Sequence, residues 1–225
     1  MELIDPRTLL LVANLLGLLC ALVLWVQAKS FPADIGGLRD WAWAVVLMAC
    51  ACGLVSLRGR IPDAASIILA NGLLLFGELL LVFGLLRFNG GTPQWRPAVD
   101  AILGIVVLLT WLTYGSHSYA GRLFIMSIAH VAFFSVGAWL AWQAKPAGFG
   151  RYFLSGTFVL IVLVAAWRLA TLSAGVEDTD DIFDRSLIQQ VYLGSLALGI
   201  LGFSIGFILL ANERLREELE YLATR

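Results

Sequence analysis

Four polar residues interrupt otherwise apolar stretches of this chain, and their side chains are the ones best suited to chemistry. Glu78 lies in the middle of the apolar stretch 73–81, and the other three are Asn71, His130 and Arg168. An ionisable side chain at the centre of a bilayer costs roughly 2.5–3.5 kcal/mol even on the mildest scales, so it is normally paired or faces a wet cavity. Glu78 therefore needs a proton, a partner or a cavity.

Helix geometry indicates which of these four side chains can meet. Asn71 precedes Glu78 by seven residues, which places both on one helix face about two turns apart. His130 and Glu78 are expected at similar depths, within roughly 5 Å along the bundle by helical rise. Arg168 is expected nearer the depth of Asn71, so an Arg168–Glu78 bridge would need a bent, snorkelling side chain.

We predict that Asn71, Glu78, His130 and Arg168 form a polar pocket that opens outward and binds a small ligand or an anion. Intramembrane ionisable groups favour this functional interpretation. The structural alternative is a set of interhelical hydrogen bonds that only holds the bundle together.

The cysteines and histidines predict no metal site and no cofactor. Cys50 and Cys52 are two residues apart on a helix and point about 200° away from each other, so they form neither a metal clip nor a redox pair. His117 and His130 are the only histidines. They lie roughly 20 Å apart along a continuous helix, with a turn between them, and therefore cannot ligate one haem iron.

Composition predicts an all-α, polytopic membrane protein. Hydrophobic residues make up 60% of the 225 residues, charged residues only 14%, and the mean hydropathy is +0.87. The net charge of -1 argues against nucleic acid as a partner. A span needs roughly 20 apolar residues, and we predict seven of them, at 7–28, 39–57, 64–87, 97–115, 119–143, 151–172 and 186–211.

The distribution of basic residues predicts the orientation of the bundle, because short cytoplasmic loops carry the excess of lysine and arginine. Five basic residues lie on the side of the N-terminus: Arg7, Arg58, Arg60, Arg122 and Arg185. Nine lie on the side of the C-terminus: Lys29, Arg39, Arg87, Arg96, Lys145, Arg151, Arg214, Arg216 and Arg225. The C-terminus is therefore predicted to lie in the cytoplasm.

The last span contains a G-x-x-x-G motif, formed by Gly202 and Gly206. Small residues at this spacing let two helix backbones approach closely. The motif predicts a helix–helix contact, either within the bundle or across a dimer.

Residues 212–225 continue the last span as a charged amphipathic helix. In a heptad assignment Asn212 and Leu219 occupy a positions, while Leu215 and Leu222 occupy d positions. A single Asn at an a position fixes register and a dimeric state, so we predict a parallel dimeric coiled coil. The alternative is a helix lying on the membrane surface, which is disfavoured because anionic lipid would repel the glutamates of its opposite face.

Several segments resemble a known family. The segment NERLREELEYLATR, residues 212–225, closely resembles the signalling helix before the catalytic domain of GGDEF-type diguanylate cyclases. Residues 5–11, 30–32, 60–63 and 69–71 resemble the bacterial multi-span sensor domains attached to such cyclases. The resemblance implies an inner-membrane protein with a periplasmic N-terminus, whose membrane domain controls synthesis of cyclic-di-GMP from GTP.

This resemblance divides the chain into a sensor domain at 1–211 and, at 212–225, the start of a signalling coil leading to an output domain. The GGDEF signature and its metal-binding carboxylates do not occur in the sequence, so we expect no catalysis from this chain and a diguanylate cyclase in the full protein. The expected partners are a second copy of the chain, the lipid bilayer and a small-molecule ligand.

A transporter and a membrane enzyme are the two alternative classes of function. A small transporter or permease subunit would use Glu78, His130 and Arg168 as a path for protons or anions. A membrane enzyme or electron carrier would need a nucleophile–base pair or a metal-ligand spacing, which the sequence does not contain. The coil separates the sensor from the transporter, since a transporter has no need of a register-fixing Asn212.

Overall fold

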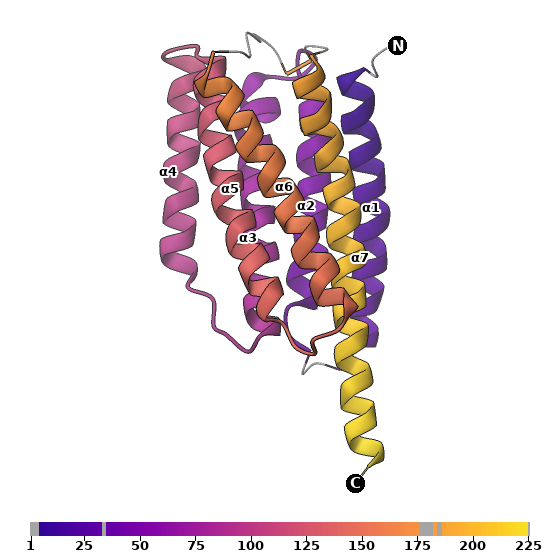
Figure 1. The fold of residues 1–225 in the computed structure, drawn as a ribbon. Coiled ribbons are helices and arrows are strands. Elements are labelled where there is room, and N and C mark those ends of the chain that lie inside the picture. The colour runs from indigo at the N-terminus through magenta and orange to yellow at the C-terminus, as the bar shows by residue number, and fades with distance from the viewer. Residues whose placement is uncertain (1–4, 33–34, 176–181, 184–185, 225) are drawn as a thin grey trace.

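The computed structural model describes residues 5–32, 35–175, 182–183 and 186–224. Within these ranges the chain forms seven long helices and no strands (Figure 1). They are α1 (Pro6–Ser30), α2 (Leu38–Ser56), α3 (Ala70–Phe88), α4 (Trp95–Tyr114), α5 (Tyr119–Gln143), α6 (Phe149–Ser173) and α7 (Leu187–Ala223), with a π-helical segment, η1 (Ala64–Leu69), directly before α3. All seven are long and apolar enough to cross a membrane, which confirms the predicted all-α membrane architecture.

With η1 counted as the start of α3, the first six predicted spans match these helices to within two residues at each end. The seventh differs, because α7 continues as one helix through the predicted boundary at residue 211. The chain therefore has no break between the predicted sensor domain and the predicted coil.

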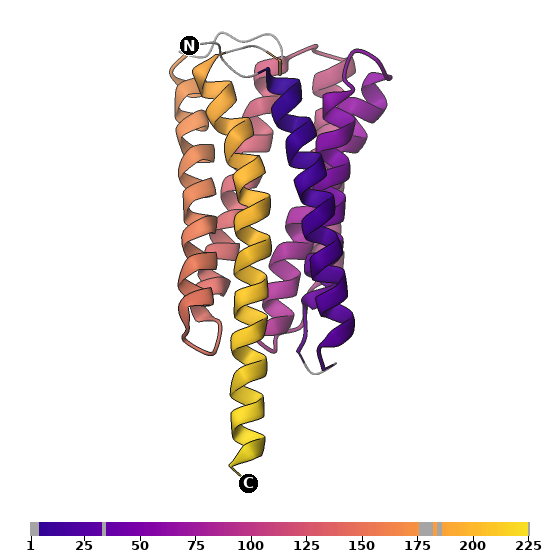
Figure 2. The same cartoon turned by 90° about the vertical axis from the view of Figure 1, so that its right-hand side faces the viewer.

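Among the described helices, six form a closed ring in the order α1, α2, α3, α5, α6, α7, and α7 packs against α1 to complete it. The fourth helix, α4, lies outside the ring against α3 and α5 (Figure 1). The start of α1, the end of α6 and the start of α7 lie at one end of the bundle, and the last turns of α7 extend from the other (Figures 1 and 2).

Short polar and proline segments start several of these helices. Ser118 and Ser186 precede α5 and α7, and their hydroxyls accept hydrogen bonds from backbone amides in the first turn, as N-cap residues do. Pro6 occupies the first turn of α1, where its missing N–H costs nothing. After Pro62 the chain enters η1, and the backbone amides of Ala65 and Ser66 both donate to the Pro62 carbonyl.

The interior of the ring is filled by large aromatic side chains near the end from which the C-terminus leaves. Trp41 is fully buried and stacks on Phe207 with ring centroids 4.1 Å apart. Gly84 makes room for this indole, because a Cβ at residue 84 would overlap the Trp41 ring. Apolar helices gain little by leaving lipid for each other, so close packing of this kind is what holds a membrane bundle together.

The G-x-x-x-G motif makes a contact within the bundle. A Cβ added at Gly202 would lie 2.6 Å from Thr157, and one at Gly206 would lie 2.9 Å from Leu154. Both neighbours belong to α6, so the motif is used for α6–α7 packing. This decides between the two contacts that the sequence left open for these glycines.

The outer surface of the bundle is rich in exposed apolar side chains. They include Leu15, Leu22, Val107, Trp139 and Leu163, each of which is at least 60% exposed. Large exposed apolar surfaces mark contacts with membrane or protein. Together with the helix lengths, they support burial of the bundle in lipid.

Beyond the bundle, α7 projects as a single helix (Figure 2). Leu219 and Leu222 are 57% and 66% exposed, and Asn212 is also exposed. Leu215 is half-buried and packs against the core of the bundle. The apolar a and d positions beyond Leu215 are thus open in one copy of the chain, and their pairing in a dimeric coil stays a prediction.

Candidate functional site

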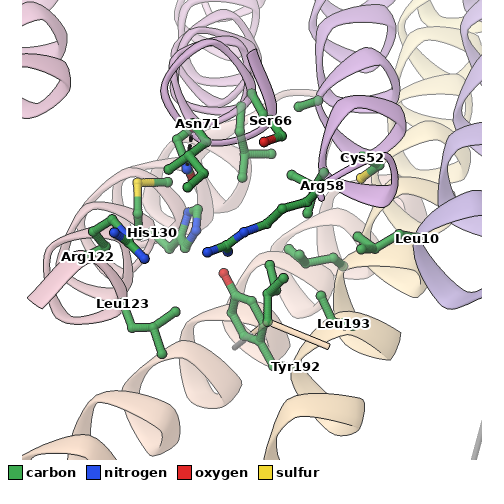
Figure 3. A pocket seen from close by; sticks show the side chains of 18 of the residues that line it. Leu10, Cys52, Arg58, Ser66, Asn71, Arg122, Leu123, His130, Tyr192 and Leu193 are labelled. Atoms are coloured by element: carbon green, nitrogen blue, oxygen red, sulfur yellow. Dashed lines mark hydrogen bonds between the residues drawn. The ribbon is translucent and has the colours of Figure 1, made fainter. Parts of the chain in front are cut away.

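A cavity of about 80 Å³ opens at the end of the bundle that carries the N-terminus. Its walls come from α1, α2, η1, α3, α5, α6 and α7, with α4 taking no part. Three arginines, one histidine and two tyrosines lie among apolar side chains in this wall, several of them visible in Figure 3. Three of the four sequence-predicted residues line it: Asn71, His130 and Arg168.

Arg168 is held at the cavity by contacts from α7. Its side chain is only 1% exposed, its guanidinium donates to Gln189 Oε1 at 2.5 Å, and its Cζ lies 3.9 Å from the centre of the Tyr192 ring. The guanidinium also hydrogen-bonds the Tyr192 hydroxyl. Arg168 therefore connects α6 to the first turns of α7, and it makes these contacts instead of a bridge to Glu78.

Gln189, which the sequence did not single out, fixes this arrangement. It is fully buried, and its Nε2 donates to the carbonyl of Ile182 at 2.8 Å. The amide orientation that satisfies this bond presents Oε1 to the Arg168 guanidinium. The only sign of this role in the sequence was a Gln in the first turn of an apolar helix.

Glu78 and His130 form a buried pair that joins α3 to α5. Glu78 Oε1 lies 2.6 Å from His130 Nδ1, and the two side chains are 0% and 1% exposed. This contact agrees with the similar depth expected from helical rise. His130 lines the cavity, whereas Glu78 lies behind it and does not. Among the described residues His130 Nε2 has no hydrogen-bond partner.

The Asn71 side chain forms a hydrogen bond within its own helical segment. Its Nδ2 donates to the Ile67 carbonyl at 2.7 Å, in the last turn of η1. A π-helical turn leaves backbone carbonyls poorly matched, and such turns often occur at functional sites. Asn71 thus lines the cavity while satisfying a backbone carbonyl, and it makes no direct contact with Glu78, two turns away.

Two further arginines, Arg58 and Arg122, line the cavity; the sequence analysis counted both only as basic residues on the side of the N-terminus. Arg58 directly follows α2, and Arg122 lies in the first turn of α5. Their Cζ atoms lie 5.8 Å and 5.5 Å from the centre of the same Tyr119 ring. In the sequence, the only sign of this pair was an arginine at the same end of each of two spans, with Tyr119 three residues before Arg122.

The chain matches no family model, no curated protein and no solved structure. Its function is therefore argued from the site and from the way the helices connect it to the rest of the molecule.

The arrangement is suited to binding an anion. Three guanidiniums border one small cavity, and in partly dehydrated sites hydrogen bonds from a guanidinium to an anion are among the strongest that proteins make. Across the described residues, no group of three or more His, Cys, Asp or Glu side chains is placed to hold a metal ion. The site can bind and position a ligand with these donors.

The described interior offers no charged path across the bundle. Its buried acidic and basic side chains are Glu78, His130 and Arg168, all in the half of the bundle that contains the cavity. Below His130 lie the rings of Phe134, Phe158 and Phe203, with neighbouring centroids 4.5–6.1 Å apart. These rings fill the interior of the bundle next to the cavity.

Proposed function

We propose that this chain is the membrane sensor domain of a bacterial signalling protein: a ligand in the cavity controls a cytoplasmic diguanylate cyclase through α7. The cavity faces the periplasm and the C-terminus lies in the cytoplasm of the inner membrane. The chain acts as a homodimer, because a diguanylate cyclase needs two catalytic domains facing each other. The arginines of the cavity bind the ligand, and the residues of α7 report its presence.

The observation that carries this proposal is the continuity of α7. Tyr192, Leu193 and Leu196 of α7 line the cavity, and the same helix runs for 37 residues to Ala223, beyond the bundle. At about 1.5 Å per residue this helix is about 55 Å long. A shift or rotation of its first turns is therefore transmitted along a rigid element to its far end.

Contacts at both ends of α7 link it to the rest of the bundle. Near the cavity, Arg168 of α6 binds Gln189 and Tyr192. At the opposite end the carboxylate of Glu213 accepts a hydrogen bond of 2.9 Å from the backbone amide of Gly150, at the start of α6. A carboxylate at a helix N-terminus is favoured by the helix dipole. The helix pair α6–α7 thus has a defined attachment at each end that a ligand can bias.

The test uses the chain joined after Arg225 to a GGDEF cyclase domain in proteoliposomes, with cyclic-di-GMP synthesis from GTP as the readout. Tyr192→Phe removes the hydroxyl that bonds Arg168 and keeps the ring. We expect the synthesis rate to change about 2- to 10-fold, the factor that corresponds to one hydrogen bond of about 0.5–1.5 kcal/mol. Tyr152→Phe is the matched control, since Tyr152 is 48% exposed and does not line the cavity.

A synthesis rate that stays equal in Tyr192→Phe, Tyr152→Phe and the unchanged chain would contradict control of the cyclase by the cavity. A rate that changes with Tyr192→Phe alone supports the proposal. Thermal unfolding of each protein in detergent is measured in parallel, so that a change in output is compared at equal folded fraction.

A further inference from the structure

Arg58 and Arg122 approach the cavity from opposite sides (Figure 3). Both are half-buried. Both guanidinium carbons lie less than 6 Å from the centre of the Tyr119 ring. Two positive groups this close to one ring repel each other.

Within the described part of the chain, this positive charge is only partly balanced by carboxylates. Asp63 is close enough to attract Arg122, but no carboxylate of the described residues forms a salt bridge with Arg122 or Arg58. The Glu78 carboxylate is paired with His130. An anion bound between Arg58 and Arg122 would relieve their repulsion and receive charge-assisted hydrogen bonds from both.

Most of the remaining cavity wall is apolar, although His130, Arg168 and Asn71 also line it. The apolar part includes Leu10, Leu74, Leu123, Met126, Leu193 and Leu196. A fully polar anion such as phosphate would leave oxygens without partners against this wall, which is costly. An apolar group on the anion would instead be buried favourably. An apolar cavity of about 150 Å³ binds one benzene molecule, so a cavity of about 80 Å³ limits that group to about two to four carbons.

We propose that the cavity binds a short-chain carboxylate, with its carboxylate between Arg58 and Arg122 and its hydrocarbon chain against the leucine and methionine wall. This proposal rests on the proposed function and names the ligand class of the same site. The hydrocarbon part of the ligand lies against Leu193 and Leu196 of α7, so a bound ligand directly contacts the helix that leaves the bundle.

Binding is measured by isothermal titration of the full chain in lipid nanodiscs at constant ionic strength. Sodium butyrate is the probe, and n-butanol, butylammonium chloride and sodium phosphate are the comparison compounds. We expect saturable binding of butyrate with a raised thermal unfolding temperature, and weaker or no binding of the other three. Equal binding of butanol or butylammonium, tighter binding of phosphate, or no binding of butyrate would overturn the proposal.

Substitutions locate the carboxylate. Arg58→Gln and Arg122→Gln should each weaken butyrate binding about tenfold or more, as expected for the loss of a charge-assisted hydrogen bond. Arg60→Gln is the matched control, because Arg60 is exposed, two residues from Arg58, and does not line the cavity. Equal affinity in all three variants would overturn the assignment. If one variant does not fold, the other still decides.

Ligand class and sensory function are separated by adding butyrate to the cyclase fusion in proteoliposomes. Butyrate binding that is lost in Arg58→Gln but leaves cyclic-di-GMP synthesis unchanged supports the ligand class and contradicts the sensor. Synthesis that responds to Tyr192→Phe in a protein that binds no carboxylate contradicts the ligand class and leaves the sensor standing.

Discussion

Replacing one member of the Glu78–His130 pair should destabilise the bundle much more than replacing both. The two side chains are buried, and Oε1 and Nδ1 lie 2.6 Å apart. At an effective dielectric constant of 20, opposite unit charges at that distance attract by about 6 kcal/mol. Dehydrating each group costs several kcal/mol, which offsets this attraction. The pair as a whole then contributes close to zero to the free energy of unfolding. Either group alone is a dehydrated polar group without its partner, which destabilises the bundle.

The expected magnitudes follow from this balance. Glu78→Leu and His130→Phe, each made alone, should lower the free energy of unfolding by about 3–5 kcal/mol, as for other buried pairs that lose one partner. The double variant replaces both by apolar side chains of similar size, so it should lie within about 1 kcal/mol of the unchanged chain. The coupling energy of the cycle is therefore expected to exceed about 3 kcal/mol.

Reversible unfolding in mixed detergent micelles measures these free energies, with intrinsic fluorescence following the packing of Trp41 on Phe207. Thr113→Val is the control, because the buried Thr113 hydroxyl bonds only the Leu109 carbonyl of its own helix, and its loss should cost about 1 kcal/mol or less. If the two single effects add to within about 0.5 kcal/mol in the double variant, the reasoning is wrong and the side chains do not act as a pair.

Two further predictions concern the membrane and the coil, and both use a cysteine-free background. Cysteines at Ser173 and Ala223, which lie at opposite ends of the bundle, should react with impermeant reagents from outside and inside the cell respectively; labelling from the same side would contradict the orientation. Cysteine at Leu222, an exposed d position, should crosslink to its counterpart in a second copy of the chain, while cysteine at Glu217, an f position, should not; equal crosslinking would rule out the coil.

Sequence alone predicted the helices and the depth of their polar residues. A run of apolar residues of the required length predicts each span, and the helical rise then converts residue number into depth. That is why the first six spans agree with the structure to within two residues when η1 is counted with α3, and why Glu78 and His130 were expected at one level.

Which side chains meet at a given depth required the tertiary structure, because depth does not fix how each helix is rotated or which helix is its neighbour. Arg168 lies with Asn71 in the half of the bundle where α1 begins, yet it contacts Gln189 and Tyr192 of α7. Asn71 turns its amide to the Ile67 carbonyl of the preceding π-helical turn. Neither partner is visible in the periodicity of the chain.

The cavity shows the same division between sequence and fold. Arg58 and Arg122 lie at the ends of spans, where an arginine is usually solvated and carries no ligand. The closed ring of helices brings the end of α2 and the start of α5 to one opening, where both guanidinium carbons lie within 6 Å of the Tyr119 ring centre. The sequence thus determined seven apolar helices, the last of which continues past the bundle. The order of helices around the ring decided which charges share a site, since that order depends on packing between segments distant in the chain.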